Sequence, residues 1–311
     1  MHISVSFRVL GMLLMLFSSA ALGPLLIAVL EDDQTALAFA YGIGITFFSG
    51  LCMWLPVRNV RHELRIRDGF LITSLFWTVL GLFGALPFVF SEDLNLTVTE
   101  AIFESISGLT TTGATVIVGL DDLPHSILIY RQLLQWLGGI GIIVVAVAVL
   151  PMLGIGGMQL YKAETPGPSK DSKLTPRITE TAKALFSVYL TLTVACAIAY
   201  YAAGMSGFDA VAHAFSTVAI GGFSTHDASM GYFENDAILL ICSLFMIISA
   251  INFGLHFLAW RRRTGAVYGK DSETRFFLSV LTVCIVITCA YLVLSGTFSA
   301  REGIVHGLFQ A

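Results

Sequence analysis

The sequence predicts an all-α integral membrane protein that repeats a unit of one helix, a short re-entrant helix with its loop, and a second helix. Three observations predict this fold: an apolar composition, alternating charge in the loops, and an internal repeat. Hydrophobic residues make up 56% of the 311 residues, and charged residues make up only 12%. That charged share is about half the value of a typical soluble domain. Such an apolar surface would aggregate in water.

Seven apolar runs approach or exceed the roughly 20 residues that a helix needs to cross a bilayer. The first run begins at Arg8 and has small residues near Ser18, as a signal peptide does. Its apolar stretch continues through Pro24 to Leu30, however, so we expect an uncleaved helix. The runs are 8–30, 37–57, 70–90, 127–152, 182–204, 236–260 and 275–297.

The basic residues alternate with the runs. Of the 17 lysines and arginines, only Arg131 and Arg301 fall on the side opposite the N-terminus. The positive-inside rule therefore places the N-terminus in the cytoplasm. The triplet Arg261–Arg263 is expected to anchor this topology, and binding of anionic lipid is a second interpretation.

The external connections after the third and fifth runs contain the repeat. Each begins with an apolar segment of about ten residues, which is too short to cross a bilayer but suits a re-entrant helix. At a constant offset of 109, Glu100–Ser107 aligns with Asp209–Ser216, and Thr110–Thr115 aligns with Ala219–Ser224. Both copies enter from the predicted cytoplasmic side. They are therefore parallel repeats, unlike the inverted repeats of many secondary transporters.

The residues that follow each short helix suit the binding of a dehydrated cation. Such an ion needs oxygen ligands in place of water, and successive backbone carbonyls can supply them. Non-helical backbone is tolerated at membrane depth where it lines a cavity, and glycine supplies the positive φ angles that this requires. Gly113 and the pair Gly221–Gly222 fit this role. Threonine hydroxyls at 110–112 either pack behind the carbonyls or add oxygens, and acidic residues in the outer loops would attract cations.

Three segments together, Thr110–Thr115, Arg131–Gly141 and Ala219–Ser224, resemble the TrkH/KtrB superfamily. The two additional N-terminal helices make the chain more similar to TrkH than to KtrB. The resemblance implies a potassium uptake protein of the bacterial inner membrane, with four repeats around one pore. It also implies a homodimer gated by a cytoplasmic, TrkA-like nucleotide-binding protein.

Residue roles follow from this resemblance by matching positions. It implies potassium as the transported ion, lipid as the surroundings, and no covalent cofactor, transition-metal site or nucleic-acid partner. The filter glycines would be Gly113 and Gly222, supported by Thr110 and Ala219. The carbonyls that face potassium would belong to Thr111, Thr112, Ile220 and Gly221.

The domain boundaries follow the repeat. We expect a two-helix extension at 1–68, a first repeat at 69–160 with its pore loop at 98–116, and a second repeat at 161–265 with its pore loop at 207–225. Residues 266–311 would begin a third repeat, in which either His306 or Gln310 aligns with His213. Because four filters are expected, we interpret the chain as a truncated product that does not conduct alone. A half-size subunit that assembles into a ring is the alternative.

Several residues leave two interpretations open. Arg131 either pairs with an acidic loop residue or lies at the membrane interface. His213 has either a hydrogen-bonded packing role or a position near the ion path. The proline-containing loop 154–180 is the expected contact for a cytoplasmic partner. The five cysteines lie in apolar runs, so we expect small core residues rather than disulfides or metal ligands.

Two other function classes remain. A cation-coupled secondary transporter, such as a K⁺/H⁺ or K⁺/Na⁺ symporter with broken helices, is the alternative to a channel-like protein. The near absence of carboxylates in the middle of the runs disfavours it. An intramembrane enzyme would need a nucleophile and a base, or a set of metal ligands, at membrane depth. The sequence shows neither, so we expect no enzymatic activity.

Overall fold

The computed structural model describes residues 3–60, 66–141, 178–296 and 298–311. Within these ranges every regular element is a helix, and there is no β-strand. The fold is therefore all-α, as the sequence predicts.

The N-terminal part consists of two long helical segments that pack closely. The first is interrupted by a 3₁₀ turn, and the second ends in another. A Cβ added at Gly11 would lie 2.6 Å from the carbonyl oxygen of Gly50, and the reverse substitution gives the same distance. Small residues of this kind let membrane helices approach through their backbones. The elements are α1 (Ile3–Ser18), η1 (Ser19–Ala21), α2 (Leu22–Leu30), α3 (Ala36–Trp54) and η2 (Leu55–Val57).

The remaining helices follow the predicted repeat order. The first set is α4 (Ile66–Gly84), α5 (Leu86–Phe90), η3 (Glu92–Leu94), α6 (Val98–Leu109), η4 (Leu120–Asp122) and α7 (His125–Ile140). The second set is α10 (Ile178–Ala202), α11 (Gly207–Val218), η5 (Ser229–Phe233), α12 (Asp236–Ala250) and α13 (Phe253–Arg262). The chain then continues through α14 (Ala266–Lys270), α15 (Ser272–Leu294) and α16 (Ala300–Gln310).

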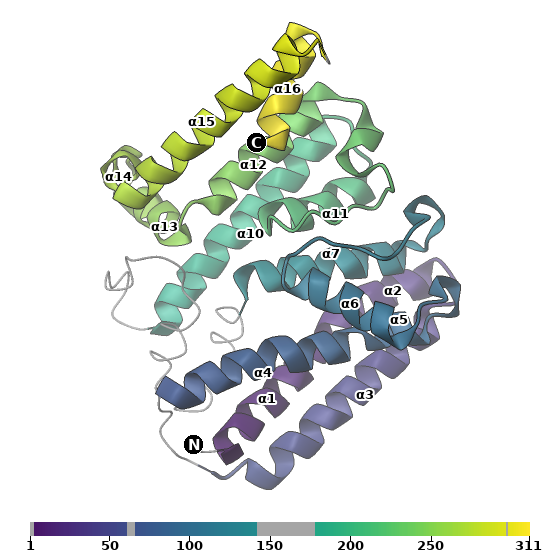
Figure 1. Cartoon of the computed structure of the whole chain (residues 1–311). Helices are drawn as coiled ribbons and strands as arrows, with labels where there is room; N and C mark the ends of the chain where they lie inside the picture. The colour runs from purple at the N-terminus through teal and green to yellow at the C-terminus, as the bar shows by residue number, and fades with distance from the viewer. Residues whose placement is uncertain (1–2, 61–65, 142–177, 297) are drawn as a thin grey trace.

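Helices α6, α7 and α11 lie in the middle of the molecule. Figure 1 shows α1, α3 and α4 at one end and α15 with α16 at the other. Helix α7 contacts the short helices of both predicted repeats, α6 and α11.

The helix lengths indicate a membrane protein, as the composition predicts. Four segments of the described chain are long and apolar enough to cross a bilayer, and the bent pair α12–α13 would add a fifth. The third predicted run lies on α4 and α5, whose apolar part, Ser74–Phe90, is shorter than these spans. Residues 142–152 of the fourth run lie outside the described residues. The four segments are Ser4–Leu30, Ala36–Val57, Lys183–Ala202 and Ser272–Leu294.

The sixth predicted run, 236–260, is not one continuous helix. Helices α12 and α13 meet at 90°. Ile251 is extended, with φ −75° and ψ 142°, and the side chain of Asn252 accepts the Gly254 N–H at 2.9 Å, which starts a new helix. The His256 ring lies 2.9 Å from the Ile248 carbonyl at the end of α12. The apolar run hid this break because capping depends on one polar side chain and not on hydropathy.

The cysteines are only partly core residues. All five are free; Cys196 and Cys242 are buried, whereas Cys52 and Cys284 are exposed on α3 and α15. The prediction of a core position is wrong for these last two. A helix in lipid can present apolar side chains outward, so an apolar run does not assign a residue to the core. No group of residues able to hold a metal ion occurs in the described ranges.

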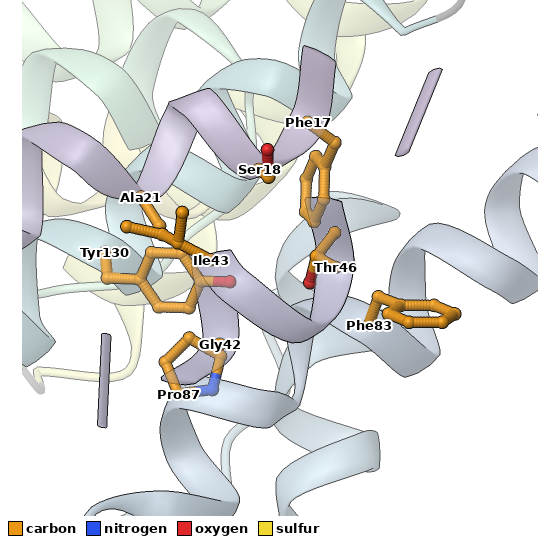
Figure 2. Close-up of a pocket in the computed structure, with 9 residues that line it drawn as sticks. All are labelled: Phe17, Ser18, Ala21, Gly42, Ile43, Thr46, Phe83, Pro87 and Tyr130. Atoms are coloured by element: carbon orange, nitrogen blue, oxygen red, sulfur yellow. The ribbon is translucent and has the colours of Figure 1, made fainter. Parts of the chain in front are cut away.

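A cavity of about 10 Å³ lies among the N-terminal helices, α4, α5 and α7. This is room for about one water molecule. The Tyr130 hydroxyl, which faces it in Figure 2, donates to the Gly84 carbonyl at 2.9 Å. The cavity is too small to admit a substrate. It lies where the N-terminal extension packs against the rest of the fold. Its lining residues are Phe17, Ser18, Ala21, Gly42, Ile43, Thr46, Phe83, Pro87 and Tyr130.

Candidate functional site

The two short helices α6 and α11 begin in the same way. Thr97 caps α6 by accepting the Glu100 N–H at 3.3 Å, and the Glu100 carboxylate accepts the Thr97 N–H at 2.8 Å. Ser206 caps α11 by accepting the Asp209 N–H at 3.0 Å. These caps satisfy N–H groups that a helix start leaves unpaired. Both helices are 12 residues long, so their capped starts lie at the same distance along the chain from the loops that follow.

Helix α16 has the same start and favours one of the two alignments left open by the sequence. Ser299 and Glu302 form a capping box like that of α6. Ser206 and Asp209 align with Ser299 and Glu302 at an offset of 93, and the same offset aligns His213 with His306. The shared cap therefore favours His306 over Gln310.

Both short helices end in the same unusual backbone conformation. Thr111 and Ile220 have φ angles of 55° and 54°, and Gly113 and Gly222 have φ angles of 77° and 86°. Positive φ is strained at both positions, because threonine and isoleucine are β-branched. Such strain occurs where the surrounding structure enforces it, often at functional sites. The offset of 109 is therefore a repeat in backbone geometry as well as in sequence.

Backbone hydrogen bonds explain how this conformation is held. In both copies three successive N–H groups after the helix turn back to helix carbonyls. No hydrogen bond within the described residues reaches the carbonyl oxygens of Thr111, Thr112, Ile220 or Gly221. Their N–H groups are satisfied while their carbonyls stay free, the arrangement that cation ligands require. The bonds are Thr110 to Ile106, Thr111 to Gly108, Thr112 to Ser107, Ala219 to Phe215, Ile220 to Thr217 and Gly221 to Ser216.

The two segments approach each other at backbone distance. A Cβ added at Gly113 would lie 2.1 Å from the Gly221 carbonyl oxygen. The structure thus brings together the residues predicted from the two loops, Thr110–Gly113 and Ala219–Gly222. Thr110 donates its hydroxyl to the Ile106 carbonyl at 2.7 Å and lies 2.8 Å from the Thr112 hydroxyl. Their assignment as potassium ligands stays a prediction.

Arg131 is fully buried, so the interface interpretation of this residue is wrong. Its Nε donates to Glu104 of α6 at 2.8 Å, and Nη2 donates to the Thr115 hydroxyl at 3.0 Å. Nη1 donates to the Ser224 carbonyl at 2.9 Å, and the guanidinium lies 4.4 Å from the Phe223 ring centre. Arg131 therefore pairs with a carboxylate, but with one on the short helix rather than in a loop.

His213 occupies the position of Glu104 in the second copy. Glu104 accepts the Thr115 hydroxyl at 2.9 Å, and His213 Nε2 lies 2.9 Å from the Ser224 hydroxyl. Both pairs are related by the offset of 109. The packing interpretation of His213 is therefore confirmed, because its ring bonds Ser224 in the loop that follows its own helix, α11. The alignment of the two loops at an offset of 109 pairs Glu104 with His213. This pairing could have identified Glu104 from the sequence as a residue that holds its loop.

Helix α7 contacts both segments through small and polar residues that the sequence analysis did not single out. The side-chain amide oxygen of Gln135 (Oε1) accepts the Phe223 N–H at 3.0 Å. A Cβ added at Gly138 would lie 1.8 Å from the Leu109 carbonyl oxygen, and one added at Gly139 would lie 2.8 Å from the Ala219 Cβ. The segment Arg131–Gly141 thus has its composition because it lies between the ends of α6 and α11.

The outer loops are linked by charged and polar contacts. Asp227 accepts the N–H groups of Gly119 and Leu120, each at 3.0 Å. The His226 ring contacts the Asp121 carboxylate, and this hydrogen bond lowers the pKa of Asp121. Acidic side chains at this end of the molecule therefore hold the two loops together as well as adding negative charge.

The predicted partner loop, 154–180, is largely outside the described residues; only its last residues, at the start of α10, fall within them. The triplet Arg261–Arg263 lies exposed at the end of α13.

Comparison with known proteins gives a consistent match. Residues 36–298 match the TrkH family, described as a cation transport protein. The chain is 58% identical over 310 residues to a protein of Halomonas elongata named Trk system potassium uptake protein TrkH. It is 53% identical over 309 residues to the protein of that name from Escherichia coli K12. These matches cover 100% and 99% of this chain, and 64% of each relative.

A solved structure agrees with the fold. The crystal structure of the potassium transporter TrkH from Vibrio parahaemolyticus superposes with a TM-score of 0.86 and 50% identity. It is matched by 100% of this chain, which covers 64% of that protein. The chain therefore spans slightly less than two thirds of the length of these relatives.

Proposed function

Because this chain belongs to the TrkH family of cation transport proteins, we propose that it forms the first part of a potassium uptake protein. The family is one of transport proteins and not of enzymes. In this proposal α6 and α11 are pore helices, and the segments after them are two filter segments, 110–113 and 219–222. The carbonyls of Thr111, Thr112, Ile220 and Gly221 bind dehydrated potassium ions.

One observation carries the proposal. Two segments 109 residues apart share the same positive φ angles and the same backbone hydrogen bonds, and their predicted ion-facing carbonyls accept no hydrogen bond among the described residues. Thr112 and Ile220 are exposed and Thr111 is half-buried, so this part of both segments is accessible to an ion. A cation that replaces its water shell with these oxygens would satisfy them. The C-terminal ends of α6 and α11 adjoin the same segments, and helix C-termini favour positive charge.

The domain and partner predictions belong to the same proposal. Residues 69–160 and 161–265 form the two repeats, and 266–311 begins a third, supported by the shared N-cap of α16. We place the protein in the bacterial inner membrane with its N-terminus in the cytoplasm. We expect it to work as a homodimer with a TrkA-like nucleotide-binding partner on the cytoplasmic side.

Growth of a bacterial host without potassium uptake systems tests the proposal. The host would express this chain alone, or a chimera in which the chain replaces the matching part of the Vibrio parahaemolyticus relative. We expect the chimera to restore growth at low potassium and the chain alone not to. A Gly113→Ser chimera should lose rescue or admit sodium, because its side chain would meet the Gly221 carbonyl.

Each result has a defined meaning. Rescue by the chain alone would contradict the expectation that it does not conduct alone and would favour assembly from short subunits. A chimera that reaches the membrane with its cytoplasmic partner present, yet does not restore growth, would contradict potassium uptake through this segment.

A further inference from the structure

Two residues of α7 each bond a backbone group of the two residues that directly follow the second filter segment, Phe223 and Ser224. Arg131 donates to the Ser224 carbonyl at 2.9 Å, and Gln135 accepts the Phe223 N–H at 3.0 Å. Residues four apart lie on the same face of a helix. Arg131 and Gln135, here called the cross-repeat brace, therefore connect α7 of the first repeat to the residues directly after the filter segment of the second.

The cost of burying Arg131 indicates that this contact has a purpose beyond packing. Both Arg131 and Glu104 have side chains with 0% exposure. Removing two charges from water is so costly that apolar residues of similar size often give equal or greater stability. A buried ion pair is therefore weak support for a purely stabilising role, and conformational specificity is the alternative to test.

The second repeat shows what the arginine adds. There His213 holds the Ser224 hydroxyl, just as Glu104 holds Thr115, and no buried cation is involved. A loop can therefore be held to its own pore helix by a contact that involves no arginine. What Arg131 adds is its bond to the Ser224 carbonyl, which crosses to the second repeat as the Gln135 bond does.

We infer that the cross-repeat brace positions the second filter segment and thereby sets the preference of this site for potassium over sodium. This inference rests on the proposed function. The brace adjoins the predicted ligands directly: a Cβ added at Gly221 would lie 2.4 Å from the Gln135 side-chain carbonyl carbon. A displacement of Phe223 and Ser224 would move the Gly221 carbonyl with them, because only Gly222 separates Phe223 from Gly221. Arg131 and Gln135 are positioning residues, since neither is proposed to touch the ion.

Two chimera variants separate positioning from stability. Arg131→Gln combined with Glu104→Gln removes both charges at once and leaves no unpaired buried charge. Gln135→Met keeps the arginine and similar volume but removes the acceptor of the Phe223 N–H. Tyr130→Phe is the matched control, because it removes a buried hydrogen bond of α7 that points away from the filter, to Gly84.

The first measurement is hydrogen exchange of the purified chimeras, which does not depend on transport. Exchange at 219–226 should be faster in both brace variants. Exchange at 98–109 should be unchanged in Gln135→Met, which leaves Glu104 in place, and exchange at 219–226 should be unchanged in Tyr130→Phe. The second is uptake of potassium and sodium. Hydrogen bonds to charged groups are strong enough for their loss to lower the potassium preference about tenfold or more.

The outcomes distinguish this inference from the proposed function. Unchanged exchange at 219–226 in both brace variants overturns the inference whatever the chimera transports. Faster exchange with an unaltered potassium preference overturns the claim on selectivity. If the unmodified chimera takes up no potassium, the proposed function fails, and the exchange result still decides whether the brace positions the segment. If the double variant does not reach the membrane, Gln135→Met decides both points.

Discussion

Replacing Gly113 with alanine would place a methyl group between the two filter segments. The added Cβ would lie 2.1 Å from the Gly221 carbonyl oxygen, and ordinary contact begins near 3.4 Å. The segments would therefore have to separate by about 1.3 Å. Alanine at a φ of 77° adds about 1–2 kcal/mol of backbone strain. Both effects act where the predicted potassium ligands lie.

We expect the Gly113→Ala chimera to lose most of its preference for potassium over sodium. A loss of about 1.4 kcal/mol in discrimination corresponds to a factor of ten. The assay is uptake of each ion in cells of the same host, corrected for the amount of protein in the membrane. Gly119→Ala is the matched control, because Gly119 has a φ of 74° but no atom near the added Cβ.

The control carries similar backbone strain without the clash. If the reasoning is right, Gly119→Ala keeps the potassium preference while Gly113→Ala loses it. A potassium preference that is unchanged in both variants would refute the claim that the approach of Gly113 to Gly221 shapes the site. Equal loss in both would attribute the effect to strain alone.

Two further predictions concern stability. Gly138→Ala should destabilise the protein strongly, since its Cβ would lie 1.8 Å from the Leu109 carbonyl oxygen, whereas Gly44→Ala on α3 meets nothing and should be neutral or slightly stabilising. Thermal unfolding in detergent checks this, and similar melting temperatures for both would contradict the backbone contact. Because the His226 hydrogen bond lowers the pKa of Asp121, that contact stabilises the loops at neutral pH. Its contribution is present above the ordinary aspartate pKa of about 3.9 and is lost as pH falls through the lowered pKa. Asp121→Asn should therefore reduce the pH dependence of unfolding in acid, and an unchanged pH profile would count against this contact.

The sequence by itself determined the class of protein and the positions of its repeated parts. Apolar runs of membrane length predict helices because a bilayer demands satisfied backbone groups. The offset of 109 located the two segments proposed as filters, since the glycines that permit positive φ recur at the same spacing, at Gly113 and Gly222. Ser299 and Glu302 were also readable as a cap, although the sequence analysis left the alignment of α16 open.

Only the tertiary structure decided how these parts contact one another. Arg131 meets Glu104 and Ser224, which are 27 and 93 residues away in the chain, so no local pattern identifies the pairs. The bend after α12 depends on Asn252, a single residue within an apolar run. Hydropathy and periodicity describe one segment at a time, whereas buried charge, close glycine contacts and helix breaks depend on what lies opposite. The family resemblance supplied the proposed function, and packing around α7 determined which residues hold the candidate site.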